Sequence, residues 1–372
     1  MIESPPIWMW IVGFLLVLGP LVTVHELGHY LVGRLFGVKA DAFSVGFGKE
    51  IAGYTDRRGT RWKLCALPLG GYVQFAGDMN PASIPDAAAL ARIPSEQRNG
   101  NFHFAPLWQR TLIVAAGPVT NFLVAVVILA GFAMVYGQMV TPPVVDSVVE
   151  SSAAAEAGIE VGDRIVAVNG AKTGSFEDVA KIVSIHPGER VLVEFERNDR
   201  RMEVPVTLDM LVETDNFGNK FRTGRLGVGA SERVIRSVSA AESIPLAVRQ
   251  TGEIMNMMVT GIGQIITGRR PLQELGGPVK IAKFSAEQLS LGWTSFIWFV
   301  AMISINLAFI NLLPIPALDG GHLAFYVAEA VRRKPVDARS QEWAFRTGMA
   351  FVIALMLFVT INDFASLPVF GG

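Results

Sequence analysis

Long apolar stretches alternate with polar segments along the chain, and four of them are long enough to cross a lipid bilayer. An α-helix rises about 1.5 Å per residue, so roughly 20 apolar residues span a hydrocarbon core of about 30 Å. The stretches that meet this length are Ile7–Leu35, Leu107–Tyr136, Trp293–Leu313 and Trp343–Ile361. The hydrophobic pattern therefore predicts four transmembrane helices.

The positions of lysine and arginine predict the orientation of these helices. Residues 39–98 and 332–339 connect the first pair and the last pair of apolar stretches, and both connections are rich in basic residues. Segments 1–6 and 362–372 contain neither Lys nor Arg. Because short basic loops remain cytoplasmic, we expect both termini and the long segment 138–292 to lie on the opposite side.

The connection between the first two apolar stretches has the pattern of β-structure. Residues 41–75 alternate apolar and polar side chains, and Gly46 and Gly48 are among the glycines at turn positions. Such alternation is typical of strands. We expect a β-hairpin or small sheet here, for which a purely structural role is one interpretation.

The segment opposite the basic loops contains a soluble α/β module. Short β-branched runs separated by turn signals, and a helical stretch near Glu177–Ser184, fill residues 144–208. The order of these parts, and the sequence AAAEAGIEVGDRIVAVNG at Ala153–Gly170, resemble a bacterial PDZ domain. Only one such module is found.

An amphipathic pattern follows the module, between Ala240 and Ala286. Apolar residues at helical spacing are interrupted by Gln, Glu and Arg, which is typical of a helix at a membrane interface. The alternative is a fifth spanning helix, which would give an odd number of crossings and contradict the charge pattern.

The composition supports a membrane protein and restricts the chemistry of any site. Charged residues make up 17% of the chain, below the roughly 25% usual in soluble domains, and the mean hydropathy is +0.40. The formal net charge of -1 argues against a nucleic-acid partner. Cys65 is the only cysteine, so a metal site would have to use histidine and carboxylate ligands.

A metal-binding motif lies inside the first apolar stretch. His25 and His29 are separated by one helical turn and can bind one metal ion, while Glu26 lies beside them as a base. Polar groups at this depth are costly and usually mark function. The alternative is a polar cluster that only joins helices.

Catalytic zinc usually has three protein ligands, and Asp319 is the predicted third. Eighteen residues separate Ile7 from His25, and twenty separate Trp293 from Leu313, so both sites lie roughly 27–30 Å along helices that enter from the same side. Asp319 follows shortly, after two prolines that interrupt the helix. Asp319 could instead only form a turn at the end of the helix. His322 could be a fourth metal ligand, could contact one of the ligands from outside the coordination shell, or could be structural.

These motifs together resemble the site-2 protease family of intramembrane zinc proteases. The resemblance covers nearly the whole chain and rests on HELGH at residues 25–29, LDGGH at 318–322, GPVTN at 117–121, the Gly46-Phe47-Gly48 stretch and the PDZ-like module. It implies that zinc is bound by His25, His29 and Asp319 and that Glu26 is the catalytic base. It further implies that Asn121, Asn311, Gly46 and Gly48 bind the substrate.

The resemblance also implies an activity and a location. We expect an intramembrane zinc endopeptidase of the bacterial inner membrane, with periplasmic termini. Its substrates would be single-pass membrane proteins, such as an anti-sigma factor after a first cut, or signal-peptide remnants. The alternative is a non-catalytic, PDZ-containing membrane adaptor with a structural metal site, for which Glu26 would be unnecessary.

The expected fold is an α-helical membrane protein with four transmembrane helices, a membrane-associated β-hairpin or sheet and one periplasmic PDZ-like α/β domain. The predicted segments are 1–38 (first helix), 39–106 (β region), 107–137 (second helix), 138–230 (PDZ-like domain), 231–292 (amphipathic region), 293–325 (third helix with LDG motif), 326–342 (cytoplasmic loop), 343–362 (fourth helix) and 363–372 (periplasmic tail).

Overall fold

The structure is a computed structural model that describes residues 5–77, 98–214, 220–268, 271, 276–334 and 336–365. Most of the predicted C-terminal tail and residues 78–97 of the predicted β region lie outside the described residues. The chain divides into two compact units, which we describe separately. The first combines residues 1–131 with 241–372, and the second is Phe132–Ala240.

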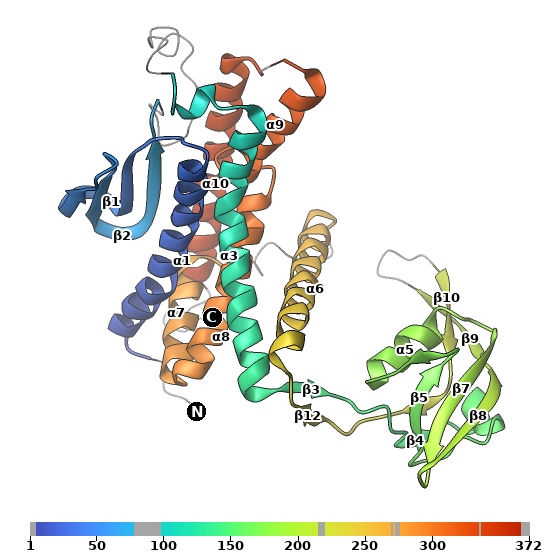
Figure 1. The fold of residues 1–372 in the computed structure, drawn as a ribbon. Coiled ribbons are helices and arrows are strands. Elements are labelled where there is room, and N and C mark those ends of the chain that lie inside the picture. The colour runs from blue at the N-terminus through green and yellow to red at the C-terminus, as the bar shows by residue number, and fades with distance from the viewer. Residues whose placement is uncertain are drawn as a thin grey trace. The chain divides into compact units, whose positions relative to one another are not determined.

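Helices form most of the first unit (Figure 1). Their bounds are α1 Ile7–Leu35, the short 3-10 helix η2 Phe102–Phe104, α3 Leu107–Tyr136, α6 Ala240–Ile266, α7 Pro278–Ser290, α8 Trp293–Leu312, α9 Asp319–Arg332 and α10 Ala338–Ala365. Among the described residues, α1, α3, α8 and residues 339–365 of α10 are long and apolar enough to cross a membrane. The prediction of four apolar helices is therefore confirmed, and α6 is not among them.

The predicted amphipathic region consists of two helices. Helix α6 ends before Gly268, whose φ of +71° suits a helix terminus, and Pro278 begins α7. The fully buried Ala247 of α6 packs with Ala125 of α3 and Ala301 of α8, so the apolar side of α6 contacts these two helices. Placement at a membrane interface stays a prediction.

Glycines allow α1 to approach its neighbours closely. A Cβ added at Gly13 would lie 2.9 Å from the backbone of Ser285 in α7, and one at Gly28 would lie 2.6 Å from the carbonyl oxygen of Ala116 in α3. Helix α1 is thus held between α7 and α3 by backbone contacts that a larger residue would separate.

The region after α1 forms the predicted β-structure, in strands β1 Ala40–Thr55 and β2 Arg61–Phe75. Each strand is used twice, because Phe43 pairs with both Val73 and Trp62, and Trp62 also pairs with Tyr54. The order across the sheet is therefore 71–75, 40–45, 61–64 and 52–55. Figure 1 shows this sheet beside α1, and Phe43 packs in a core with Tyr30 of α1.

The second unit has its own core and a small four-stranded sheet in the order β6-β5-β7-β8. Its elements are β3 Gln138–Val140, β4 Ser147–Val148, α4 Ala153–Glu156, β5 Arg164–Val168, β6 Ala171–Lys172, α5 Phe176–Ser184, β7 Arg190–Arg197, β8 Arg200–Thr207, β9 Asp209–Thr214, β10 Lys220–Arg225, β11 Val228–Gly229 and β12 Val234–Arg236. The helix expected near Glu177–Ser184 is α5, and a capping box between Ser175 and Asp178 stabilises its first turn.

An ion pair with a buried carboxylate fastens a turn of the second unit to its sheet. Asp163 is buried, and both its carboxylate oxygens accept hydrogen bonds from Arg197 at 2.7 Å. Burial raises the pKa of Asp163, but Arg197 and the backbone N–H of Glu160 outweigh it and hold that pKa below its usual value. The turn is therefore fixed by a charged pair that persists at neutral pH.

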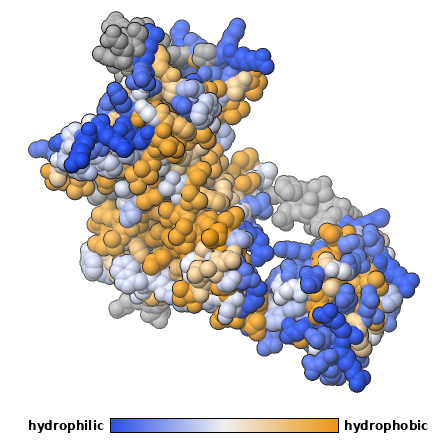
Figure 2. All heavy atoms as spheres, viewed as in Figure 1, coloured by the Kyte–Doolittle hydropathy of each residue, from blue (hydrophilic) through white to orange (hydrophobic). Residues whose placement is uncertain are grey.

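The surfaces of the two units differ in polarity. In Figure 2, apolar side chains cover much of the visible face of the first unit, whereas the second unit is largely hydrophilic. Large apolar side chains of the first unit remain more than half exposed, for example Leu31, Val127 and Ile353. Such a surface is expected of helices that contact lipid.

Candidate metal centre

Helix α1 supplies two of the three groups that converge at the candidate metal centre. His25 and His29 lie one turn apart on the same face of α1 and are only 7% and 9% exposed. Their Nε2 atoms are 3.2 Å apart. The regular geometry of the helix therefore brings two imidazoles to one point.

The third group comes from the turn between α8 and α9. Asp319 is the first residue of α9, and the two glycines that follow let the start of this helix fold against the preceding loop. A Cβ at Gly320 would collide with the carbonyl oxygen of Leu313, and one at Gly321 would lie 2.5 Å from that of Ile315. These close contacts fix the direction in which Asp319 leaves the loop.

The three predicted ligands meet. The Asp319 Oδ2 atom lies 3.1 Å from Nε2 of His25 and 3.5 Å from Nε2 of His29. This oxygen is buried, and no donor among the described residues forms a hydrogen bond of ordinary geometry with it. A tetrahedral ion with bonds of about 2.0–2.2 Å holds its ligand atoms roughly 3.3–3.6 Å apart, so these atoms fit one small metal ion. Two imidazoles and one carboxylate are a typical ligand set of catalytic zinc.

Glu26 contacts the edge of the β-sheet. Its Oε2 atom accepts a hydrogen bond of 3.0 Å from the backbone N–H of Val73. Val73 pairs with Phe43 on its other side, in the outermost segment of the sheet. Because that N–H points away from the paired strand, the outer edge of this segment at Val73 lies against the predicted catalytic base.

Helix α3 contacts the outer nitrogens of both imidazoles. The Nδ1 atom of His29 lies 2.8 Å from the carbonyl oxygen of Ile113, and Nδ1 of His25 lies 3.2 Å from Nδ2 of Asn121. Gly117 lies between these contacts, and a Cβ there would lie 2.8 Å from Cε1 of His25. The structure places Asn121 against Nδ1 of His25, and the substrate contact that the family resemblance implies for Asn121 stays a prediction. The contact made by Ile113 was not expected from the sequence.

The remaining predicted substrate-binding residues lie on α8 and β1. Asn311 is in the last turn of α8 and is half-buried. Gly46 and Gly48 lie in β1 with φ of +89°, and a Cβ at Gly46 would lie 2.6 Å from the carbonyl oxygen of Leu67. Both glycines therefore bend the strand, and a contact with substrate stays a prediction for all three residues.

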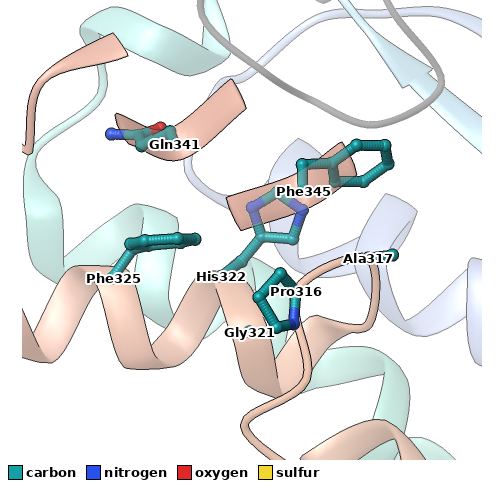
Figure 3. A pocket seen from close by; sticks show the side chains of 7 residues that line it. All are labelled: Pro316, Ala317, Gly321, His322, Phe325, Gln341 and Phe345. Atoms are coloured by element: carbon teal, nitrogen blue, oxygen red, sulfur yellow. The ribbon is translucent and has the colours of Figure 1, made fainter. Parts of the chain in front are cut away.

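His322 lines a small cavity between α9 and α10. Figure 3 shows it with Phe325, Gln341 and Phe345 around that cavity. Among the described residues, His25, His29 and Asp319 form the group with metal-binding geometry, and this group does not include His322. The structure therefore places His322 beside this cavity, and a role as a fourth ligand or an outer-shell partner stays a prediction.

Comparisons with known proteins give a consistent family. The family model described as Peptidase family M50 matches residues 13–355, which include all the residues above. "Putative zinc metalloprotease Atu1380" of Agrobacterium fabrum is 45% identical over 96% of this chain and 96% of its own length. "Metalloprotease MmpA" of Caulobacter vibrioides is 34% identical over 97% of this chain and 96% of its own length.

The match to solved structures is limited to part of the chain. The PDZ domain of an SdrC-like protein from Listeria monocytogenes covers 23% of this chain and 84% of that domain, at 20% identity and a TM-score of 0.19. A match at this level carries no conclusion, so the PDZ-like character of the second unit stays a prediction.

Proposed function

Because the chain belongs to peptidase family M50, we propose that it is an intramembrane zinc endopeptidase that cleaves single-pass membrane proteins. The observation that carries the proposal is the convergence of His25, His29 and Asp319 within apolar helices and their connecting turn. Family membership supports a zinc metalloprotease. The apolar surface of the surrounding helices supports a site at membrane depth.

Each residue has one task in the proposed reaction. When bound, zinc supplies Lewis acidity that activates water and polarises a carbonyl group. Glu26 accepts the proton from the attacking water and returns it to the leaving amide nitrogen. The N–H of Val73 holds Oε2 of Glu26, which leaves its second carboxylate oxygen for the water.

The sheet edge offers a way to present a substrate. A transmembrane helix hides its carbonyl groups in internal hydrogen bonds and must be opened before hydrolysis. Residues 71–75 pair with β1 on one side, and the N–H of Val73 on the other side donates to Glu26. An unwound substrate segment added along this edge would replace its lost hydrogen bonds and lie beside the base.

We also propose the biological setting that the family resemblance suggests. The substrates would be an anti-sigma factor after a first cut, or signal-peptide remnants, in the bacterial inner membrane. The distribution of Lys and Arg supports cytoplasmic connections 39–98 and 332–339 and periplasmic termini. The second unit would then be periplasmic and limit or recruit substrates.

The Glu26→Gln variant tests this proposal. In reconstituted vesicles, cleavage of a tagged single-pass substrate should fall about 10²–10⁴-fold, the usual contribution of a general base, while bound zinc stays unchanged. The matched control is Glu253→Gln on α6, whose side chain is 61% exposed, and it should cleave normally. Unchanged cleavage by Glu26→Gln would refute the mechanism.

A further inference from the structure

We infer that one face of α3, formed by Ile113, Gly117 and Asn121, positions both histidines and selects the tautomer in which they bind a metal. The inference rests on the proposed metal site and adds a role that the sequence did not predict. Asn121 is thereby a positioning residue for His25 and not a group that holds substrate.

The three residues form a continuous stripe. Positions 113, 117 and 121 are four residues apart, so they lie on one face of α3. A Cβ at Gly117 would collide with Nε2 of His29 and approach His25. Because Gly117 has no side chain, the two imidazoles lie directly against the α3 backbone. The carbonyl of Ile113 lies one turn before Gly117, and the amide of Asn121 lies one turn after it.

The partner of His29 determines its tautomer. Its Nδ1 atom lies 2.8 Å from the carbonyl oxygen of Ile113, which can only accept a hydrogen bond. Nδ1 must therefore carry the proton. In the neutral ring, the lone pair is then on Nε2, the atom that faces Asp319.

The partner of His25 allows two arrangements, of which one can bind a metal. With the amide Nδ2 of Asn121 toward Nδ1, as in this structure, the neutral ring carries its proton on Nε2, where a metal needs a lone pair. With Oδ1 toward Nδ1, the proton is on Nδ1 and Nε2 is free. The two arrangements differ by a half-turn of a planar amide and occupy the same volume.

The surroundings of Asn121 support a role in positioning. The residue is fully buried, and its Oδ1 atom has no hydrogen-bond partner among the described residues. Its backbone carbonyl accepts a 2.7 Å hydrogen bond from Ser304 of α8. The residue is thus fixed between α3 and α8, and a half-turn of its amide would bring the unpartnered Oδ1 to Nδ1 of His25 as an acceptor.

The test is zinc affinity of the full-length protein in detergent, measured by competition with a chelator. Replacement Asn121→Leu should weaken zinc binding about 10- to 100-fold, as is usual when the outer partner of a ligating histidine is lost. Asn121→Asp should bind zinc at least as tightly as the unmodified chain, because a carboxylate also accepts from Nδ1–H. Asn256→Leu, an exposed asparagine on α6, is the matched control and should bind normally.

Two outcomes separate this inference from the proposed function. Zinc binding by Asn121→Leu equal to that of the unmodified chain, with only a raised KM, would overturn the positioning role and leave the protease intact. Zinc binding by His25→Ala equal to that of the unmodified chain would overturn the metal site itself. If Asn121→Leu does not fold, a tenfold loss of affinity in folded Asn121→Asp would equally overturn the inference.

Discussion

At the scale of single residues, the candidate metal centre combines side chains placed by helix geometry with contacts that depend on the packing of α3. The spacing of His25 and His29, and the depth of Asp319, follow from helix geometry alone. The contacts of Ile113 and Asn121 depend on how α3 packs against α1, which no local pattern specifies. The structure therefore adds a contact between Asn121 and His25 that the sequence did not predict, while a substrate contact of Asn121 stays a prediction.

Gly117 gives a direct test of this packing. Replacement Gly117→Ala places a methyl group against both imidazoles, so we expect zinc affinity to fall at least about tenfold, because misplaced ligands bind metal poorly. Zinc affinity of the purified variant is the measurement.

Gly131→Ala in the same helix is the control, since an added Cβ there contacts nothing within 4 Å. It should bind zinc normally. Equal affinities for the two variants would show that α3 does not lie against the histidines as the structure has it.

At the scale of elements, the sequence predicts the strands but not that each strand bends and pairs with two different segments. Alternation in residues 41–75 indicates β-structure, yet it does not show that Phe43 pairs with two different segments. That arrangement requires a bend, which Gly46 and Gly48 provide through positive φ. The bend leaves residues 71–75 as the outer segment, whose Val73 contacts Glu26.

The hydrogen bond between Val73 and Glu26 can be removed without breaking a hydrogen bond between the paired strands. Replacement Val73→Pro deletes the N–H that Glu26 accepts, and proline is tolerated where the N–H points away from the paired strand. Loss of a hydrogen bond to a charged group costs about 1.5–3 kcal/mol, so kcat/KM should fall roughly 10- to 100-fold with zinc content unchanged.

Val73→Ala keeps the N–H and serves as the control, with near-normal cleavage expected. If Val73→Pro cleaves the tagged substrate as fast as Val73→Ala, the N–H of residue 73 has no part in positioning Glu26.

At the scale of the whole molecule, hydropathy predicts the long helices closely, because it averages over many residues. The expected stretches Ile7–Leu35 and Leu107–Tyr136 coincide with α1 and α3. Averaged hydropathy does not predict the shorter helices. Helix α9 fills residues 319–332, part of which was expected to be a loop, and α7 divides the amphipathic region. Both begin after interruptions by proline or glycine.

The proposed topology predicts which surfaces a membrane-impermeant maleimide reaches. In a Cys65→Ser background, a cysteine replacing exposed Glu150 should be labelled in intact spheroplasts, because this position is expected outside the cytoplasm. A cysteine replacing exposed Arg58 should be labelled only after the membrane is permeabilised. The opposite pattern would reverse the orientation and place the second unit in the cytoplasm.

The zinc content of the purified full-length protein tests the central claim most directly, because Asp319 joins the site from a distant part of the chain. We predict about one zinc ion per chain in the unmodified protein and in Glu26→Gln, and nearly none in Asp319→Ala, since an open catalytic site needs all three ligands. Stoichiometric zinc in folded Asp319→Ala, with the affinity of the unmodified chain, would contradict the proposed metal centre.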